Sequence, residues 1–179
     1  MTNYIALIRG INVGGKNKLA MADLKRELEA IGLSKVQTYI QSGNVVFRSA
    51  KDAGSLRDAI EQAITRISGI RAKVMIREQR ELDAIVAGCP YAEAAAAEGK
   101  SVHLSVLNEP LTGPQLEKLS AGCSELDRFQ ADGTVVYCHY GQSILDSKLA
   151  ANFAKLGDAV TTRNWNTVVK LQAMLRAMD

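Results

Sequence analysis

The feature that most constrains the fold of this chain is an order of strands and helices that occurs twice in its 179 residues. Short runs of apolar residues predict strands, and apolar residues at helical spacing, such as Leu24, Leu28 and Ile31, predict helices. The turn QSGN is typical of a hairpin. Ser55 is expected to cap the second helix and Gly69 to end it. The first copy comprises a strand at 3–9, a helix at 21–32, strands at 35–40 and 45–49, a helix at 55–69 and a strand at 71–77.

The second copy repeats this order without a repeat of individual residues. Pro114 is expected to open its first helix, and Asp132-Gly133 forms a hairpin turn between two strands. Strand, helix, strand, strand, helix, strand is the ferredoxin-like arrangement, so the predicted class is α+β with two antiparallel sheets. The predicted parts are a first half at 1–78, a helical connector at 79–99, and a second half at 100–179 that ends in an extra helix.

Composition excludes several classes of protein. Hydrophobic residues make up 47% and charged residues 23%, and the mean hydropathy is -0.04, which is typical of a globular protein. The start, MTNYIALIRG, has no basic segment of a signal peptide, and no apolar stretch reaches membrane length. We therefore expect a cytoplasmic protein without a membrane partner. Cys89, Cys123 and Cys138 show no C-x-x-C spacing, which argues against disulfides and structural zinc.

The placement of charge says more than the net charge of +3. Residues 1–22, 34–50 and 159–178 contain no Asp or Glu. Strands are poor in acidic residues anyway, so this pattern fits either ordinary strands or a surface that attracts anions. The basic residues in these stretches are Arg9, Lys16, Lys18, Lys35, Arg48, Arg163, Lys170 and Arg176.

A glycine-rich segment, GINVGGKN at 10–17, fits the spacing of a phosphate-binding P-loop. Asn17 stands where a P-loop needs Ser or Thr for magnesium, and the next helix begins several residues too late. No later strand ends in an Asp suited to hold the metal. The segment is therefore interpreted as a plain glycine turn or as an anion-binding loop.

Other motifs carry weaker signals. TTRNWNT at 161–167 is interpreted as the beginning of a helix, with Asn164 or Asn166 as cap and Trp165 as a packing anchor, or as a binding loop. His103 and His139 lie on separate predicted strands and are interpreted as structural. The carboxylates are scattered, so no catalytic residue is assigned, and no metal or cofactor is expected.

Taken together, IALIRGINVGGKNKLAMADLK, TYIQSGNVVF and TTRNWNTVVKL closely resemble the bacterial family called domain of unknown function 1697. The resemblance covers essentially the whole chain. It implies an α+β fold and a cytoplasmic protein. The family has no assigned activity, so no catalytic residue is carried over.

The predicted topology brings polar segments together. In a ferredoxin-like half, the loop after the first strand lies beside the hairpin between the second and third strands, which places RGINVGGKNK next to QSGN. In the second half, Ser143 and Lys148 share an edge with Arg163 and Asn164, and whether the two edges face one cleft is left open. Lys16 and Arg163 are expected to be exposed. The predicted ligand-binding residues are Arg9, Asn12, Lys16, Gln41, Asn44, Lys148, Arg163 and Asn164.

These residues suit phosphate or carboxylate groups, so the favoured function is binding of a phosphorylated or other anionic small molecule. Both a binding protein and an enzyme fit this interpretation. A nucleic-acid-binding module is the alternative, because ferredoxin-like sheets bind RNA, although SGNVVFRS lacks the RNA-binding pattern and aromatic residues are only 5% of the chain. A third possibility is an interaction protein with no small ligand.

Overall fold

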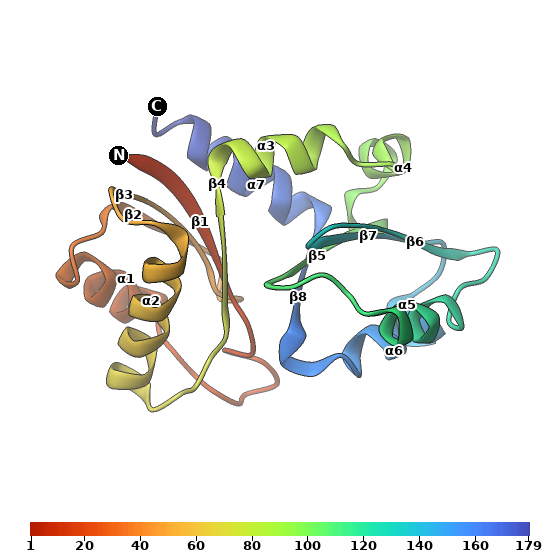
Figure 1. Ribbon diagram of the computed structural model, residues 1–179, viewed down its shortest axis with the longest axis horizontal. Helices are drawn as coiled ribbons and strands as arrows, with labels where there is room; N and C mark the ends of the chain where they lie inside the picture. Colours follow the sequence, from red (N-terminus) through yellow and green to blue (C-terminus); the bar gives the residue numbers. More distant parts are fainter. The chain divides into compact units, whose positions relative to one another are not determined.

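The computed structural model describes all 179 residues, which form two compact units (Figure 1). The first unit contains residues 1–84 and 170–179, and the second contains residues 85–169. This division differs from the expected boundaries, since most of the connector belongs to the second unit and the end of the last helix to the first. No helix combines the length and the apolar composition needed to cross a membrane.

The first unit has the predicted ferredoxin-like order. Its sheet has the strand order β2-β3-β1-β4, and every neighbouring pair is antiparallel. The helices α1 and α2 cover one face of this sheet (Figure 1). Its elements are β1 (Thr2–Ile8), α1 (Met21–Ala30), β2 (Ser34–Tyr39), β3 (Asn44–Ser49), α2 (Ala53–Ser68) and β4 (Val74–Glu78), followed by α3 (Gln79–Ala87).

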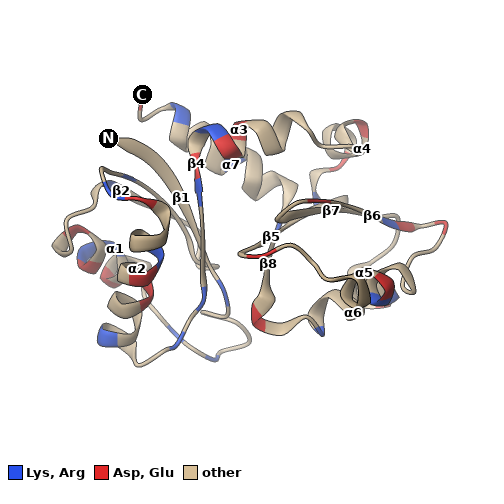
Figure 2. Cartoon of the chain, in the orientation of Figure 1, with Lys and Arg blue, Asp and Glu red and all other residues tan.

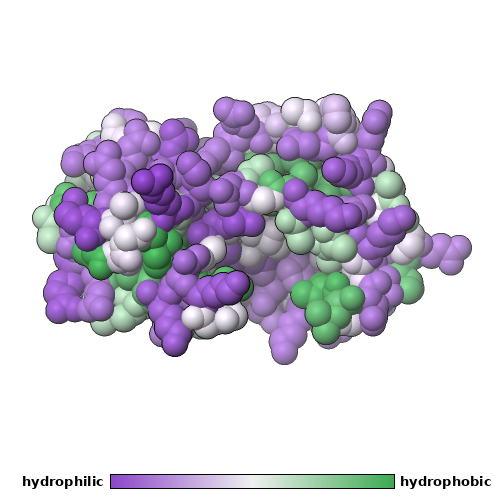
Figure 3. All heavy atoms as spheres, turned by 90° about the horizontal axis from the view of Figure 1, so that it is seen from below, coloured by the Kyte–Doolittle hydropathy of each residue, from purple (hydrophilic) through white to green (hydrophobic).

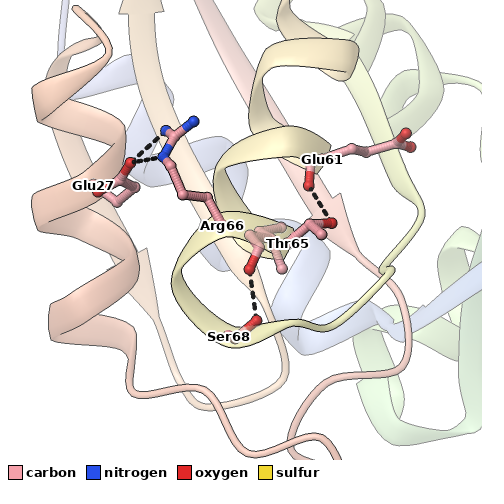
Figure 4. Close-up of polar contacts among 6 residues, drawn as sticks. Glu27, Glu61, Thr65, Arg66 and Ser68 are labelled. Carbon is pink, nitrogen blue, oxygen red and sulfur yellow. Dashed lines mark hydrogen bonds and ion pairs between the residues drawn. The ribbon is translucent and has the colours of Figure 1, made fainter.

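The core of the first unit lies between the sheet and these two helices. Leu24 and Leu28 of α1 are fully buried, as their helical spacing predicts, and truncating either to Ala costs about 2–5 kcal/mol. Arg66 of α2 pairs with Glu27 of α1 at the surface, where such a pair contributes about 0.2–1 kcal/mol (Figure 4). Burial of apolar surface therefore stabilises the helix pair more than this ion pair does.

The ends of α2 show one expectation confirmed and one wrong. Gly69 follows the helix in the left-handed region at φ 75°, where glycine is favoured. The N-cap is Asp52 rather than Ser55: an Asp52 oxygen accepts a hydrogen bond from the Ser55 backbone N–H at 3.0 Å. This bond favours the charged carboxylate and lowers the pKa of Asp52. Ser55 therefore lies inside the first turn.

Residues 178–179 cover one end of the first sheet, where β1 begins and β3 and β4 end. Asn3 Nδ2 and Gln79 Nε2 donate to the carboxylate of Asp179 at 2.9 and 3.0 Å. Arg48 donates to the carbonyl of Met178 at 2.8 Å and to Asn3 Oδ1 at 2.8 Å. We call these five residues the closed edge. Each of these four donor atoms is hydrogen-bonded to an acceptor of the same chain.

The second unit repeats the order, with a sheet of strand order β6-β7-β5-β8. Leu119, Val136, Cys138, Leu149 and Phe153 form its core between the sheet and two helices. Both halves therefore have the predicted α+β class. The elements are α4 (Ala92–Ala97), β5 (Val102–Leu107), α5 (Gly113–Ser120), β6 (Asp127–Asp132), β7 (Val135–Tyr140), α6 (Lys148–Ala154) and β8 (Val160–Asn164), with three-residue 3-10 turns at Gly99–Ser101, Ile144–Asp146 and Gly157–Ala159; α7 (Trp165–Arg176) follows β8.

Candidate functional site

The glycine-rich loop between β1 and α1 is a miniature hairpin. Val13 and Lys16 form an antiparallel bridge, and Lys16 N donates to the Val13 carbonyl at 2.9 Å. Gly14 and Gly15 both lie in the left-handed region, at φ 56° and 76°, as a two-residue type I′ turn requires. The glycines thus form a turn, which agrees with the interpretation of this segment as a glycine turn.

Asn12 joins this hairpin to the β2–β3 turn. Its Nδ2 donates to the carbonyl of Gln41 at 2.8 Å and to that of Leu19 at 2.9 Å, while its Oδ1 accepts from Leu19 N at 2.8 Å. Ile8 N also donates to the carbonyl of Gly43 at 2.8 Å. The expected meeting of the two loops at one sheet edge is confirmed. The Asn12 amide, however, is committed to the backbone rather than available to a ligand.

The other predicted residues of the first unit divide into buried and exposed ones. Asn44 is fully buried and donates to Ser42 Oγ at 2.8 Å, so it supports the turn. Arg9 is half-buried, and Lys16 and Gln41 are exposed. A shallow pocket of about 380 Å³ at this end is lined by Asn12, Gly15, Lys18, Leu19, Ala20 and Gln41.

A larger groove, of about 730 Å³, lies in the second unit. It forms where β5 begins and where β7 and β8 end, and α4 and the 3-10 turn Gly99–Ser101 supply one wall. The loop after β7 supplies another wall. The lining residues are Ala94, Ala97, Glu98, Lys100, Ser101, His103, His139, Tyr140, Gly141, Gln142, Ser143, Ile144 and Asn164.

Both histidines of the chain line this groove. His103 is in register with Cys138 and Asn164, whereas His139 is in register with Val102. Registered partners share a face of the sheet and successive residues alternate, so the two rings lie on opposite faces. The Nδ1 atom of each ring is buried without a hydrogen-bond partner. Sequence analysis missed this pair, because strand register is not visible in residue spacing.

The surroundings of the two rings favour one position for the ring proton. Burial lowers the pKa of His103, whose ring packs edge-on against Tyr140 with centroids 5.1 Å apart. A proton on Nδ1 would leave a buried N–H unpaired, which is costlier than an unpaired lone pair. We therefore assign a proton to Nε2, which makes each ring a donor at that nitrogen. His139 packs against Tyr91, with ring centroids 5.7 Å apart.

A buried carboxylate fixes the loop that forms one wall of the groove. Asp127 is 1% exposed, and its oxygens accept from Gly141 N at 3.2 Å and from Gln142 Nε2 at 2.7 Å. Gly141 also lies tightly against β6, because a Cβ there would stand 2.7 Å from the carbonyl oxygen of Leu126. These contacts hold the start of the loop in place.

The predicted residues of the second unit are only partly brought together. Asn164 lines the groove, and its Oδ1 caps α7 by accepting from Thr167 N at 3.1 Å, which leaves Nδ2 to donate to a ligand. Arg163 is half-buried rather than exposed, and its Nη1 donates to Thr161 Oγ1 at 2.8 Å; burial lowers its pKa to about 10. Lys148 is exposed on α6, and neither cation lines the groove, where Lys100 is the basic residue.

The helix interpretation of TTRNWNT is confirmed. Asn164 is the cap, and Trp165 is buried with its ring 6.3 Å from that of Tyr137. Asn166 packs onto Gly99, where a Cβ would lie 2.0 Å from its Oδ1. No group of three or more His, Cys, Asp or Glu residues is placed to hold a metal ion.

Comparison with known proteins extends this description. A conserved bacterial protein of known structure, SP0830 from Streptococcus pneumoniae, is similar over 97% of this chain and 98% of its own, with 27% identity and a TM-score of 0.79. An unknown protein from Galdieria sulphuraria is 12% identical, over 99% of this chain and 92% of its own, and its TM-score of 0.29 is too low to show a shared fold. No curated protein matches. Residues 1–137 match the family described as protein of unknown function, DUF1697, and the chain therefore belongs to that family.

Proposed function

We propose that the protein binds a phosphorylated or other anionic small molecule in the groove of the second unit. The observation that carries this proposal is the groove lining, which gathers both histidines of the chain, Asn164 and Lys100. The groove volume, about 730 Å³, lies within the range of about 300–1,000 Å³ that is common for small-molecule sites.

The donors at the groove suit an oxyanion. The Nε2–H groups of the two histidines, the Nδ2 of Asn164 and the ammonium of Lys100 can all donate to phosphate or carboxylate oxygens. Glu98 is the one carboxylate in the lining, so the site is not free of acidic residues as sequence analysis expected. Donors still outnumber it.

The hydroxyl groups of the groove support binding more than nucleophilic catalysis. Ser101 Oγ donates to the carbonyl of Glu98 at 2.7 Å, and Ser143 Oγ accepts from Leu145 N at 3.3 Å. A serine nucleophile instead needs a hydrogen bond to a general base. The proposed function is therefore a binding function, with charge stabilisation as the chemistry that the groove offers.

Isothermal titration calorimetry with inorganic phosphate, ribose 5-phosphate and adenosine monophosphate tests the proposal. The Lys100→Gln variant should weaken binding about tenfold, the effect of losing one charged hydrogen bond of about 1.4 kcal/mol. Lys155→Gln is the matched control, since Lys155 is exposed on the same unit outside the groove lining. Equal affinity in both variants, or no binding to any of the three probes, would refute the proposal; the latter result favours an interaction protein.

A further inference from the structure

An exposed basic surface, unlike the groove of the second unit, lies on the first unit. We infer that the end of the first sheet carrying the glycine hairpin binds single-stranded nucleic acid through its phosphate backbone. This surface is called the basic end and comprises residues 8–20, 39–45 and 69–75 together with Lys170. It shares no residue with the groove of the second unit, so the inference stands apart from the proposed function.

Backbone hydrogen bonds hold the three segments of the basic end together. Arg9 N donates to the carbonyl of Lys73 at 2.9 Å, which joins the loop after β1 to the segment before β4. The bond from Asn12 Nδ2 to the carbonyl of Gln41 joins the same loop to the β2–β3 turn. Asn17 Nδ2 donates to the carbonyl of Gly10 at 2.9 Å and closes the hairpin at its base. The backbone positions that carry the cations are therefore held relative to one another.

The basic end carries positive charge without compensation from its own segments. None of its residues is Asp or Glu, and Figure 2 shows Lys and Arg but no acidic residue on the loop between β1 and α1. A surface of this kind attracts a polyanion because each phosphate it neutralises releases a counterion. The exposed cations of the three segments are Lys16, Lys18, Arg71 and Lys73.

An aromatic ring at the same end favours nucleic acid over a lipid surface. Tyr39, the last residue of β2, is half-buried, and Lys170 Nζ lies 5.9 Å from the centre of its ring. A tyrosine beside cations is the combination on which unpaired bases stack. Figure 3 looks onto this end from below, and hydrophilic residues predominate there, with hydrophobic ones in separate clusters. A surface that inserts into lipid would instead present a continuous apolar face.

Recognition is confined to this end because the sheet itself is covered. Ile5 on one face and Phe47 on the other are 2% and 0% exposed. Bases therefore have no access to the faces of the central strands, where ferredoxin-like RNA-binding domains stack them. Contacts with phosphates and one tyrosine carry little sequence information, so binding should be independent of sequence.

Fluorescence anisotropy with a labelled 20-nucleotide oligo-dT, titrated at several salt concentrations, tests the inference. The logarithm of the association constant should fall linearly with the logarithm of salt, and the Lys16→Gln/Lys18→Gln double variant should reduce the slope by about 1.4, at about 0.7 for each lost contact. Arg71→Gln/Lys73→Gln should act alike. Lys148→Gln/Lys155→Gln removes the same charge from exposed sites of the second unit and should leave the slope unchanged.

Tyr39→Leu separates stacking from charge: affinity should fall at every salt concentration while the slope stays constant. Circular dichroism melts verify that each variant is folded, and the two independent lysine and arginine pairs keep the test informative if one is not. Absence of binding at 20 mM salt, or equal slopes for the basic-end and control variants, would overturn the inference. Binding to phosphatidylserine vesicles without binding to oligo-dT would overturn it in favour of a lipid surface.

Discussion

Asn12 gives the sharpest test of how the first unit builds its basic end. Its side chain makes three hydrogen bonds, with Gln41 and twice with Leu19, and its backbone is left-handed at φ 54°. At about 0.5–1.5 kcal/mol each, and toward the lower value because the site is partly exposed, the three bonds contribute about 2 kcal/mol. Asn12→Gly removes them while relieving the backbone, so its free energy of unfolding should fall by about 2 kcal/mol.

Asn12→Ala should be the less stable variant of the two. The left-handed backbone lowers the stability of the alanine variant by about 1–2 kcal/mol. The glycine variant avoids this cost but loses about 0.4–1 kcal/mol of stability, because its unfolded chain has greater entropy. The expected difference is about 0.5–1 kcal/mol in favour of glycine, measured by urea unfolding monitored by circular dichroism. If Asn12→Ala proved as stable as Asn12→Gly, the left-handed backbone would not constrain the residue at this position, and this reasoning would be refuted.

Three further changes test other parts of the structure. Asp127→Ala leaves the donors of its loop unpaired and should lower the free energy of unfolding by about 1–3 kcal/mol in urea titrations, and an unchanged midpoint would contradict this role of Asp127. Gly99→Ala should cost about 1 kcal/mol because its Cβ meets Asn166, and adding Asn166→Ala should restore the loss; a persistent loss would place the strain elsewhere. Burial raises the pKa of the Cys138 thiol from 9.0 to about 12, so the thiol ionises first in the unfolded chain, and the free energy of unfolding should fall as pH rises from 9 to 12. Urea midpoints of Cys138→Ala should fall less over this range. An identical pH dependence in the two proteins would refute this assignment.

Element order was accessible from sequence because local signals agree with it. Apolar alternation in the strands, the stripe of Leu24 and Leu28, and the stop at Gly69 each act within a few residues, and the structure keeps all of them. The cap of α2 was missed by three residues, since both Asp52 and Ser55 are good caps and only the geometry selects the first.

The candidate site was harder to predict because it depends on pairing between distant strands. Topology correctly placed Ser143 and Asn164 near the same edge, since that follows from strand direction alone. Whether a side chain faces the groove depends on register, and Arg163 pairs with Leu104 while its neighbour Asn164 pairs with His103. Arg163 therefore lies one residue further than Asn164 from the end of the sheet where the groove forms, and it does not line the groove.

Two other residues show what spacing cannot reveal. Lys148 opens α6 after a 3-10 turn at Ile144–Asp146, and the groove lining from this part of the chain stops at Ile144. Lys100 lies in a segment interpreted only as a connector, and its place at the groove depends on how the turn at Gly99 fits beneath Asn166. Neither outcome follows from residues adjacent in sequence.

The closed edge of the first sheet has an equivalent position in the second sheet. In the first sheet Tyr4 pairs with Phe47 and Glu78, and in the second sheet His103 pairs with Cys138 and Asn164. Arg48 follows Phe47, and His139 follows Cys138. Arg48 and His139 therefore occupy equivalent positions in the two sheets. Arg48 finds its acceptor in the carbonyl of Met178, whereas the Nδ1 of His139 finds none. The same scaffold thus carries two different polar groups at one position: in the first half the polypeptide itself supplies an acceptor, and in the second half the buried ring nitrogen has no partner.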